Sequence, residues 1–245
     1  MKMMKAVFLA LCLCAAPRVA AAQTMQWTDK GFASVNFGFQ AGSHDLTTTS
    51  NPQIYEEPAP ITTSQKVKGG ALFDIGAAYR VWGNNVLAGV SFTHTSSNAD
   101  ATVNASIPDP VVSDSPRAVQ TTLNDANHSE NALHFDVIWM MPVANKLDLG
   151  FFAGPTIFFV KQDTVTDLTQ ADVVEPVPTL NLSFNEVSKT TVGFNAGLDV
   201  QYLVAKKWGV GALARYSWGS ADIDGASDNL TVGGFQIAGG LRYRF

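Results

Sequence analysis

Two short stretches of the chain bring a histidine and a serine close together, and one of them also contains an acid. In His94-Thr-Ser96 the histidine and the serine share one face of a strand, because successive side chains alternate between faces. A serine hydroxyl becomes nucleophilic when a base such as histidine takes its proton, and an acid usually orients that base. Asp100 or Glu130 could supply the acid. Esterase chemistry is therefore one alternative. The Thr/Ser-rich surroundings favour the other, an unreactive polar segment where a strand ends.

The remaining histidines point to structural roles. His128-Ser-Glu130 lies in a polar stretch, where such triplets are common in loops. His134 falls on the polar face of a strand, where we expect a hydrogen bond to a neighbour. The chain has only 4 histidines, and their spacing does not fit a zinc site. We therefore expect neither a metal ion nor a cofactor.

The elements that must position these residues are strands with alternating faces. At the end of the chain, Phe235, Ile237, Leu241, Tyr243 and Phe245 share one face, and Arg242 and Arg244 lie on the other. The same alternation recurs seven more times. The eight predicted strands are 31–41, 67–81, 86–95, 131–141, 147–160, 192–202, 208–218 and 235–245.

The connections between these strands alternate in length. Three are short, 82–85, 142–146 and 204–207, and four are long, 42–66, 96–130, 162–191 and 219–231. This rhythm is typical of bacterial outer-membrane barrels, whose turns face the periplasm and whose loops face outward. A hydrocarbon solvent cannot satisfy a free strand edge, so the sheet must close. The sequence predicts an all-β fold, an eight-stranded antiparallel up-and-down transmembrane β-barrel with four long outward loops and short periplasmic turns. Six aromatic residues near the short turns fit an interfacial girdle: Tyr79, Trp82, Trp139, Tyr202, Trp208 and Tyr243.

The inward faces are rich in glycine and small polar residues. An eight-stranded barrel has an interior only wide enough for side chains, and unpaired buried charge is costly. The charged residues of the inward faces nearly cancel, which predicts a polar network that plugs the lumen; a narrow pore is the alternative. The predicted network consists of Asp74, Arg80, Asp136, Asp148, Asp199, Arg215, Arg242 and Arg244.

The N-terminus has the pattern of a secretory signal sequence. Lysines precede an apolar run from Ala6 to Ala16 that is too short to span a membrane, and small residues lead to a cleavage site between Ala22 and Gln23. We therefore expect a signal peptide at 1–22 and a single barrel domain at 23–245. The formal net charge of -5 argues against a nucleic-acid partner. A soluble periplasmic barrel with its apolar face inward is the alternative fold, but the proposed outer faces carry almost no charge.

The strand Gly209-Val-Gly-Ala-Leu-Ala-Arg-Tyr-Ser217 and the ending Gly239-Gly-Leu-Arg-Tyr-Arg-Phe245 resemble small outer-membrane barrels of the OmpA transmembrane-domain and OmpX type. The resemblance covers essentially the whole chain after the signal sequence. It implies an outer-membrane location, a monomer, and contacts with outer-membrane lipids and lipopolysaccharide. It also implies that the barrel-assembly machinery reads Leu241, Tyr243 and Phe245. No peptidoglycan-binding domain follows Phe245, so a cell-wall tether is not expected.

The long loops are acidic and rich in proline, which suits a hydrated outer surface. Bridging of divalent ions to lipopolysaccharide is an alternative, because carboxylate oxygens bind hard cations. The acids are Asp45, Glu56, Glu57, Asp100, Asp109, Asp114, Asp125, Asp163, Asp167, Asp172, Glu175, Glu186, Asp222, Asp224 and Asp228.

The sequence therefore predicts a non-enzymatic barrel that serves envelope integrity, surface recognition or adhesion through an extracellular ligand that it does not identify. The alternative is a lipid A-modifying enzyme, because His94 and Ser96 are similar to the paired His and Ser of outer-membrane lipid A deacylases. In those enzymes an Asn-Ala pair follows directly, whereas Asn98-Ala99 comes one residue late.

Overall fold

The computed structural model describes residues 27–54, 56–109, 111–112, 115–170, 180–223 and 225–245, and for 166–170 and 180–184 it describes the backbone alone. The signal sequence predicted at 1–22 and its cleavage site at Ala22 and Gln23 lie outside the described residues and stay predictions. The same holds for the loop acids Asp114, Asp172, Glu175 and Asp224. Among the described residues there is no helix that is both long and apolar enough to cross a membrane.

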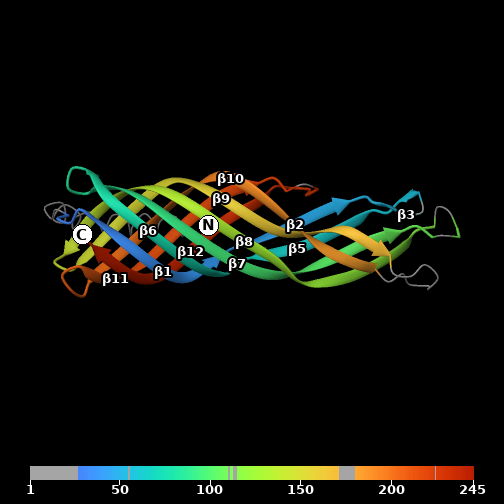
Figure 1. Ribbon diagram of the computed structural model, residues 1–245, viewed down its shortest axis with the longest axis horizontal. Coiled ribbons are helices and arrows are strands. Elements are labelled where there is room, and N and C mark those ends of the chain that lie inside the picture. Colours follow the sequence, from blue (N-terminus) through green and yellow to red (C-terminus); the bar gives the residue numbers. More distant parts are fainter. Residues whose placement is uncertain (1–26, 55, 110, 113–114, 171–179, 224) are drawn as a thin grey trace, which may run out of the picture.

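Eight strands form a closed antiparallel ring in the order β1-β6-β7-β8-β9-β10-β11-β12, and β12 pairs again with β1 (Figure 1). This confirms the predicted eight-stranded up-and-down barrel. A hairpin of β2 and β5 joins the sheet at β7, and β3 and β4 pair only with each other. The strands are β1 Gly31–Ala41, β2 Ser43–Ser50, β3 Gln53–Ile54, β4 Glu57–Pro58, β5 Ile61–Lys68, β6 Ala71–Trp82, β7 Val86–Ile107, β8 Arg117–Ala144, β9 Leu147–Gln170, β10 Leu180–Leu203, β11 Trp208–Ala221 and β12 Leu230–Arg244.

The C-terminal strand closes the ring. Its pairing with β1 runs from Phe32 opposite Arg244 to Ala41 opposite Phe235. The C-terminus lies at the end of the molecule that carries the short connections between β6 and β7, β8 and β9, and β10 and β11 (Figure 1). We call this end the turn end and the opposite one the loop end. Gly83 has φ +54° in the first of these turns, a backbone conformation that favours glycine.

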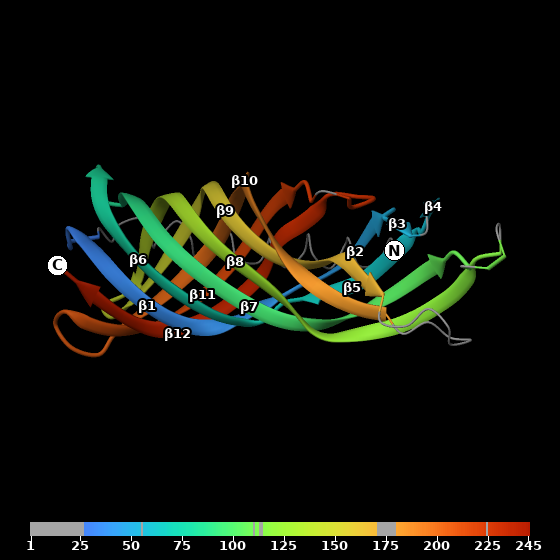
Figure 2. The same ribbon diagram turned by 45° about the vertical axis from the view of Figure 1, so that its right-hand side comes forward.

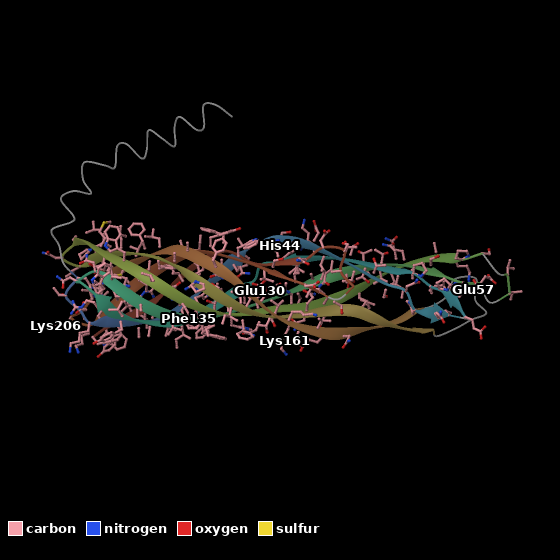
Figure 3. All side chains as sticks on the ribbon, turned by 90° about the horizontal axis from the view of Figure 1, so that it is seen from above. His44, Glu57, Glu130, Phe135, Lys161 and Lys206 are labelled. Carbon is pink, nitrogen blue, oxygen red and sulfur yellow. The ribbon has the colours of Figure 1, made fainter. Side chains whose placement is uncertain are left out.

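The two faces of the barrel wall differ as the alternation predicts. Outward apolar side chains are open to the surroundings: Phe37 is 66% exposed and Val192 69%. Their inward neighbours are enclosed, with Asn36 and Asn195 each 1% exposed. In Figure 3 aromatic side chains cover the half of the molecule that contains Phe135. Lys206 lies at the turn end and Glu57 at the loop end. An apolar belt outside and polar groups inside suit a barrel in a hydrocarbon solvent.

Several strands are much longer than the sequence predicts. The segment expected at 131–141 belongs to β8, Arg117–Ala144, and the connection expected at 96–130 is mostly β7 and β8 paired with each other. Backbone pairing needs no apolar side chains, so the ladder continues into the polar sequence. These long strands and the β2–β5 hairpin project beyond the barrel at the loop end (Figure 2). We call this part the extension: β2, β5, residues 97–107 of β7, 117–127 of β8, and the paired ends of β9 and β10.

The interior contains apolar layers as well as polar ones. Near the turn end, ten side chains including Phe32, Leu87 and Phe152 form one cluster. Near the loop end of the barrel, Phe158, Val160 and Val232 pack with Leu46 and Val67 of the β2–β5 hairpin. The hairpin thus packs against the inner wall and helps to fill the mouth of the barrel.

Candidate functional site

The centre of the barrel holds a buried ion pair between β6 and β11. Arg215 Nη1 lies 3.0 Å from Asp74 Oδ2, and both side chains are almost fully enclosed. The same guanidinium donates to Thr93 (2.8 Å) and, through Nη2, to Ser91 (2.9 Å). Asn36 donates to the other oxygen of Asp74 at 2.7 Å. These contacts tie four strands of the wall to one another across the lumen.

Two further ion pairs continue this network toward the turn end. Arg242 forms a salt bridge with Asp199, and a second contact runs from its Nε to Asp199 Oδ2 at 3.2 Å. Arg244 pairs with Asp148 and lies over the ring of Trp27, with its guanidinium carbon 4.5 Å from the ring centroid. All three arginines are buried and matched with carboxylates, so most of the energetic cost of burial is offset by charge pairing and hydrogen bonds.

Two of the eight predicted network residues are placed differently. Arg80 lies at the turn end, where its Nη1 donates to the backbone oxygen of Trp27 at 3.1 Å. Asp136 is buried, but its contact is with an amide, Asn195 Nδ2, at 2.9 Å. Asn195 also donates to Thr156, which bonds His134. Asp136 is therefore held by a neutral amide donor, and Arg80 lies outside the set of charge-paired arginines.

A second buried cluster lies at the loop end of the barrel around Glu130. The triplet His128-Ser-Glu130, expected in a loop, belongs to β8, where His128 and Glu130 are buried. The carboxylate of Glu130 accepts hydrogen bonds from Gln40 Nε2 and from the backbone N–H of Gly233, both at 3.0 Å. His128 Nε2 lies 2.9 Å from Glu130, and its Nδ1 lies 2.8 Å from Gln162 Oε1. The alternation of side chains along β8 could have predicted this cluster, because it places His128, Glu130 and His134 on one inward face.

A bend in β12 at Gly233 turns a backbone N–H toward this cluster. Gly233 has φ +88°, and a Cβ there would lie 2.4 Å from the backbone oxygen of Ser217. Only glycine fits this conformation comfortably. Its N–H is turned toward Glu130, and its carbonyl accepts from Gln40 at 3.1 Å. The bend thereby links β1, β8 and β12 at the barrel mouth.

The centre of the lumen has little free space. A cavity of about 40 Å³ lies among Asn36, Asp74, Asp136, Arg215 and Phe152. It has room for no more than a few water molecules. Side chains, and not a continuous water column, occupy this level of the barrel.

The His94 and Ser96 pair lies outside the barrel, as its parity predicts. Both side chains are exposed on β7, and His94 Nδ1 is 2.8 Å from Asn131 Oδ1. Glu130 faces the opposite way and is 5% exposed within the interior cluster. The structure therefore does not bring Glu130 to the histidine, and Asp100, the other predicted acid, is exposed on β7 with no hydrogen bond to His94 among the described contacts. Among the described residues there is also no group of His, Cys, Asp or Glu that could hold a metal ion.

The extension has an apolar core of its own. Ala59 and Ile61 pack against Val103, Ala105 and Ile107 of β7, together with Val165 of β9. Ile61, Val103 and Ile107 are at most 2% exposed. Where the extension begins, the pairing of β7 with β8 shifts register between Ala99 and Ala101, and Asp125 of β8 has φ +62°. The extension is thus a folded unit.

Hydrogen bonds to the carboxylate of Asp109 hold the connection between β7 and β8. The N–H groups of Val111 and Val112 donate to Asp109 Oδ1 at 2.9 and 3.1 Å. These two bonds hold the pKa of the Asp109 carboxyl below its usual value, and Arg117, 3.7 Å away, acts in the same direction.

The outer face of the extension is uncharged around a shallow hollow. Thr62, Asn104 and Gln120 stand opposite one another on β5, β7 and β8. With Pro60, Ser106 and Ala118 they line a hollow of about 430 Å³. Within the described part of the chain, the amides of Asn104 and Gln120 have no hydrogen-bond partner. They are free to bind a molecule from outside.

Similar solved structures are outer-membrane proteins with low sequence identity. Ail of Yersinia pestis, crystallised with the heparin analogue sucrose octasulfate, is 13% identical with a TM-score of 0.38, covering 87% of this chain and 99% of that one. Neisserial surface protein A is 12% identical (TM-score 0.43, 88% and 97% covered). The protease OmpT of Escherichia coli is 10% identical (TM-score 0.47, 91% and 100% covered).

The search of curated proteins found no match. The family model "Outer membrane protein beta-barrel domain" matches residues 6–245. The closed ring, the apolar belt and this match together show that the chain is a transmembrane β-barrel of the outer membrane and belongs to the outer membrane protein beta-barrel domain family.

Proposed function

We propose that this protein is a closed, non-enzymatic, monomeric barrel that holds a surface-recognition platform above the outer membrane. The apolar core of the extension is the observation that carries this proposal. Loops that only connect strands need no core, because solvated backbone costs little when left flexible. A packed extension instead presents its outer face in a fixed shape. Fixed presentation on a rigid scaffold is the usual arrangement of binding surfaces.

The filled lumen favours a role as a scaffold and not as a pore. Three ion pairs, the Glu130 cluster and two apolar layers occupy the interior. In planar bilayers we expect the purified protein to leave the conductance at background. Sustained steps well above background would favour the narrow porin.

The chemistry of the hollow indicates the class of ligand. Its lining combines the hydroxyl and amide groups of four residues with four apolar residues, and it contains no charged side chain. Such groups donate and accept hydrogen bonds without selecting for charge, which matches the hydroxyls of a neutral glycan. No acid is among the residues that line the hollow, and we assign the acids of the described loops to hydration of the surface.

The test compares binding of the purified wild type and Asn104→Arg/Gln120→Arg to an array of neutral glycans. Both side chains are exposed, so the double variant should fold and keep its heat-modifiable gel mobility. We expect it to lose the binding that the wild type shows. Ser188→Arg/Thr190→Arg, on exposed positions of β10, is the matched control. Equal binding by all three proteins, or none by the wild type, contradicts the proposal.

The lipid A-modifying alternative has less support, because Glu130 lies inside the barrel and the histidine is bonded to Asn131. Lipid A mass spectra from cells with the wild type, with Ser96→Ala and without the gene separate the two functions. We expect three identical spectra. A change that depends on Ser96 would establish the enzyme.

A further inference from the structure

The turn end of the barrel carries exposed lysines, in contrast to the acidic loop end. Lys146, Lys206 and Lys207 lie in the short connections, Lys30 directly precedes β1, and all four are exposed. Figure 3 shows Lys206 at this end of the molecule. Short turns of outer-membrane barrels face the periplasm, so these lysines lie at the level of the inner-leaflet headgroups.

Three of the four lysines converge around the closing strand. The backbone N–H of Lys30 donates to the oxygen of Phe245 at 2.7 Å, and the N–H of Arg244 donates to the oxygen of Lys207 at 2.8 Å. Lys30 and Lys207 thus flank the end of β12 on either side. Two strand spacings separate them, which is about 10 Å. Lys206 is the next residue in the turn.

Aromatic rings place this group of lysines at the membrane boundary. The Lys207 ammonium lies 5.9 Å from the ring centroid of Tyr243. Tyr243 in turn packs against Trp208 at 4.9 Å and Phe245 at 6.5 Å. Trp and Tyr rings prefer the zone where hydrocarbon meets headgroups. Lys207 therefore lies over the end of the apolar belt, where lipid phosphates are found.

These lysines are not neutralised by acidic side chains. Within the part of the chain that the structure describes, Lys30, Lys206 and Lys207 form no ion pair. The nearby Asp29 is directed to Arg244, at 3.7 Å. Arg80 is the residue opposite Lys30, since its backbone N–H donates to the Lys30 oxygen at 2.8 Å, and its guanidinium bonds the backbone oxygen of Trp27 at 3.1 Å, not a carboxylate. The area has a surplus of positive charge.

We propose that Lys30, Lys206 and Lys207 form a binding site for the headgroup of an anionic phospholipid in the periplasmic leaflet. The ammonium groups bind the phosphate, and Trp208, Tyr243 and Phe245 contact the glycerol and the upper acyl chains. A zwitterionic lipid presents the same phosphate but adds a cationic group, which the lysines repel. The site therefore selects lipids by net charge and fixes the closing seam of the barrel to its leaflet.

Native mass spectrometry of the full-length protein tests this inference, with equal amounts of phosphatidylglycerol and phosphatidylcholine of the same acyl chains. We expect the wild type to retain phosphatidylglycerol preferentially. Lys30→Gln/Lys207→Gln should lower that preference by about fivefold for each lysine removed, which is the usual effect of a basic residue at an anionic membrane surface.

Lys146→Gln is the matched control, because it removes one charge from the same rim at the β8–β9 turn, on the opposite side of the ring. It should leave the preference unchanged. Equal retention of both lipids by the wild type overturns the site. So does an equal loss in Lys146→Gln and Lys207→Gln, which would mean general attraction to the rim. Heat-modifiable mobility of each variant shows that the barrel has folded. Binding to isolated peptidoglycan without lipid preference would identify a different partner and also overturn it.

Discussion

Single residues inside the lumen differ in how much the barrel depends on them. Asp199 and Arg242 form a salt bridge in which the arginine is 1% exposed. Asp199→Leu leaves the guanidinium buried without its carboxylate, and such a change costs about 3–5 kcal/mol. Asp199→Leu/Arg242→Met removes both charges and should recover most of the lost free energy of unfolding. Urea titration of the protein in phospholipid vesicles, followed by tryptophan fluorescence, measures both values.

The exposed ion pair of Lys161 and Glu186, 2.8 Å apart, provides the control for the comparison of the Asp199 and Arg242 variants. Because solvent screens this pair, Lys161→Gln should change the free energy of unfolding by no more than about 1 kcal/mol. A single variant Asp199→Leu that is as stable as Lys161→Gln would show that the lumen pair is not needed for stability.

The sequence predicts which residues face inward but not how they pair. Alternation alone places Asp74, Asp199, Arg215 and Arg242 on the inner face, because the period of a strand is two. Their partners depend on the stagger of strands across the ring, which no local pattern records. Arg80 has the right parity, yet it lies near the turn end of β6 and bonds the backbone oxygen of Trp27.

At the scale of elements, β7 changes the face that carries its apolar residues. In the belt Val90 and Phe92 point outward, whereas in the extension Val103 and Ile107 point inward. The solvent explains the change, because lipid surrounds the first part and water the second. The strand prediction for 86–95 stops where this switch begins, since it follows only outward apolar residues. This change of the apolar residues from the outward to the inward face is the sequence pattern that indicates the extension.

The core of the extension makes a prediction about its integrity. Val103→Asp places an unpaired charge in that core and should open the extension while the barrel below remains folded. Trypsin applied to intact cells should then cleave at Lys66, Lys68 or Arg117. Asn104→Asp introduces the same charge one residue later on the outer face and should stay resistant. Equal resistance of both variants would show that the extension does not rely on this core.

For the whole molecule, the same outward face must serve both the membrane and assembly. Phe235 lies within β12 and Phe245 directly follows its last residue; both point outward and are similarly exposed, at 46% and 42%. They therefore contribute comparable apolar area to the belt. We propose that Phe245, with Leu241 and Tyr243, is in addition read by the barrel-assembly machinery, which needs the end of the closing strand before the ring has formed.

Phe245→Ala and Phe235→Ala separate these two roles. Both variants lose a similar apolar contact with lipid, so their folded barrels should have similar free energies of unfolding after refolding from urea in vesicles. In cells only Phe245→Ala should reduce the amount of heat-modifiable barrel in the outer membrane, by several-fold, because recognition precedes folding. Equal yields in cells would mean that Phe245 contributes only apolar area. An equal loss for both would mean that assembly responds to the apolar face of β12 as a whole, and not to its last residue.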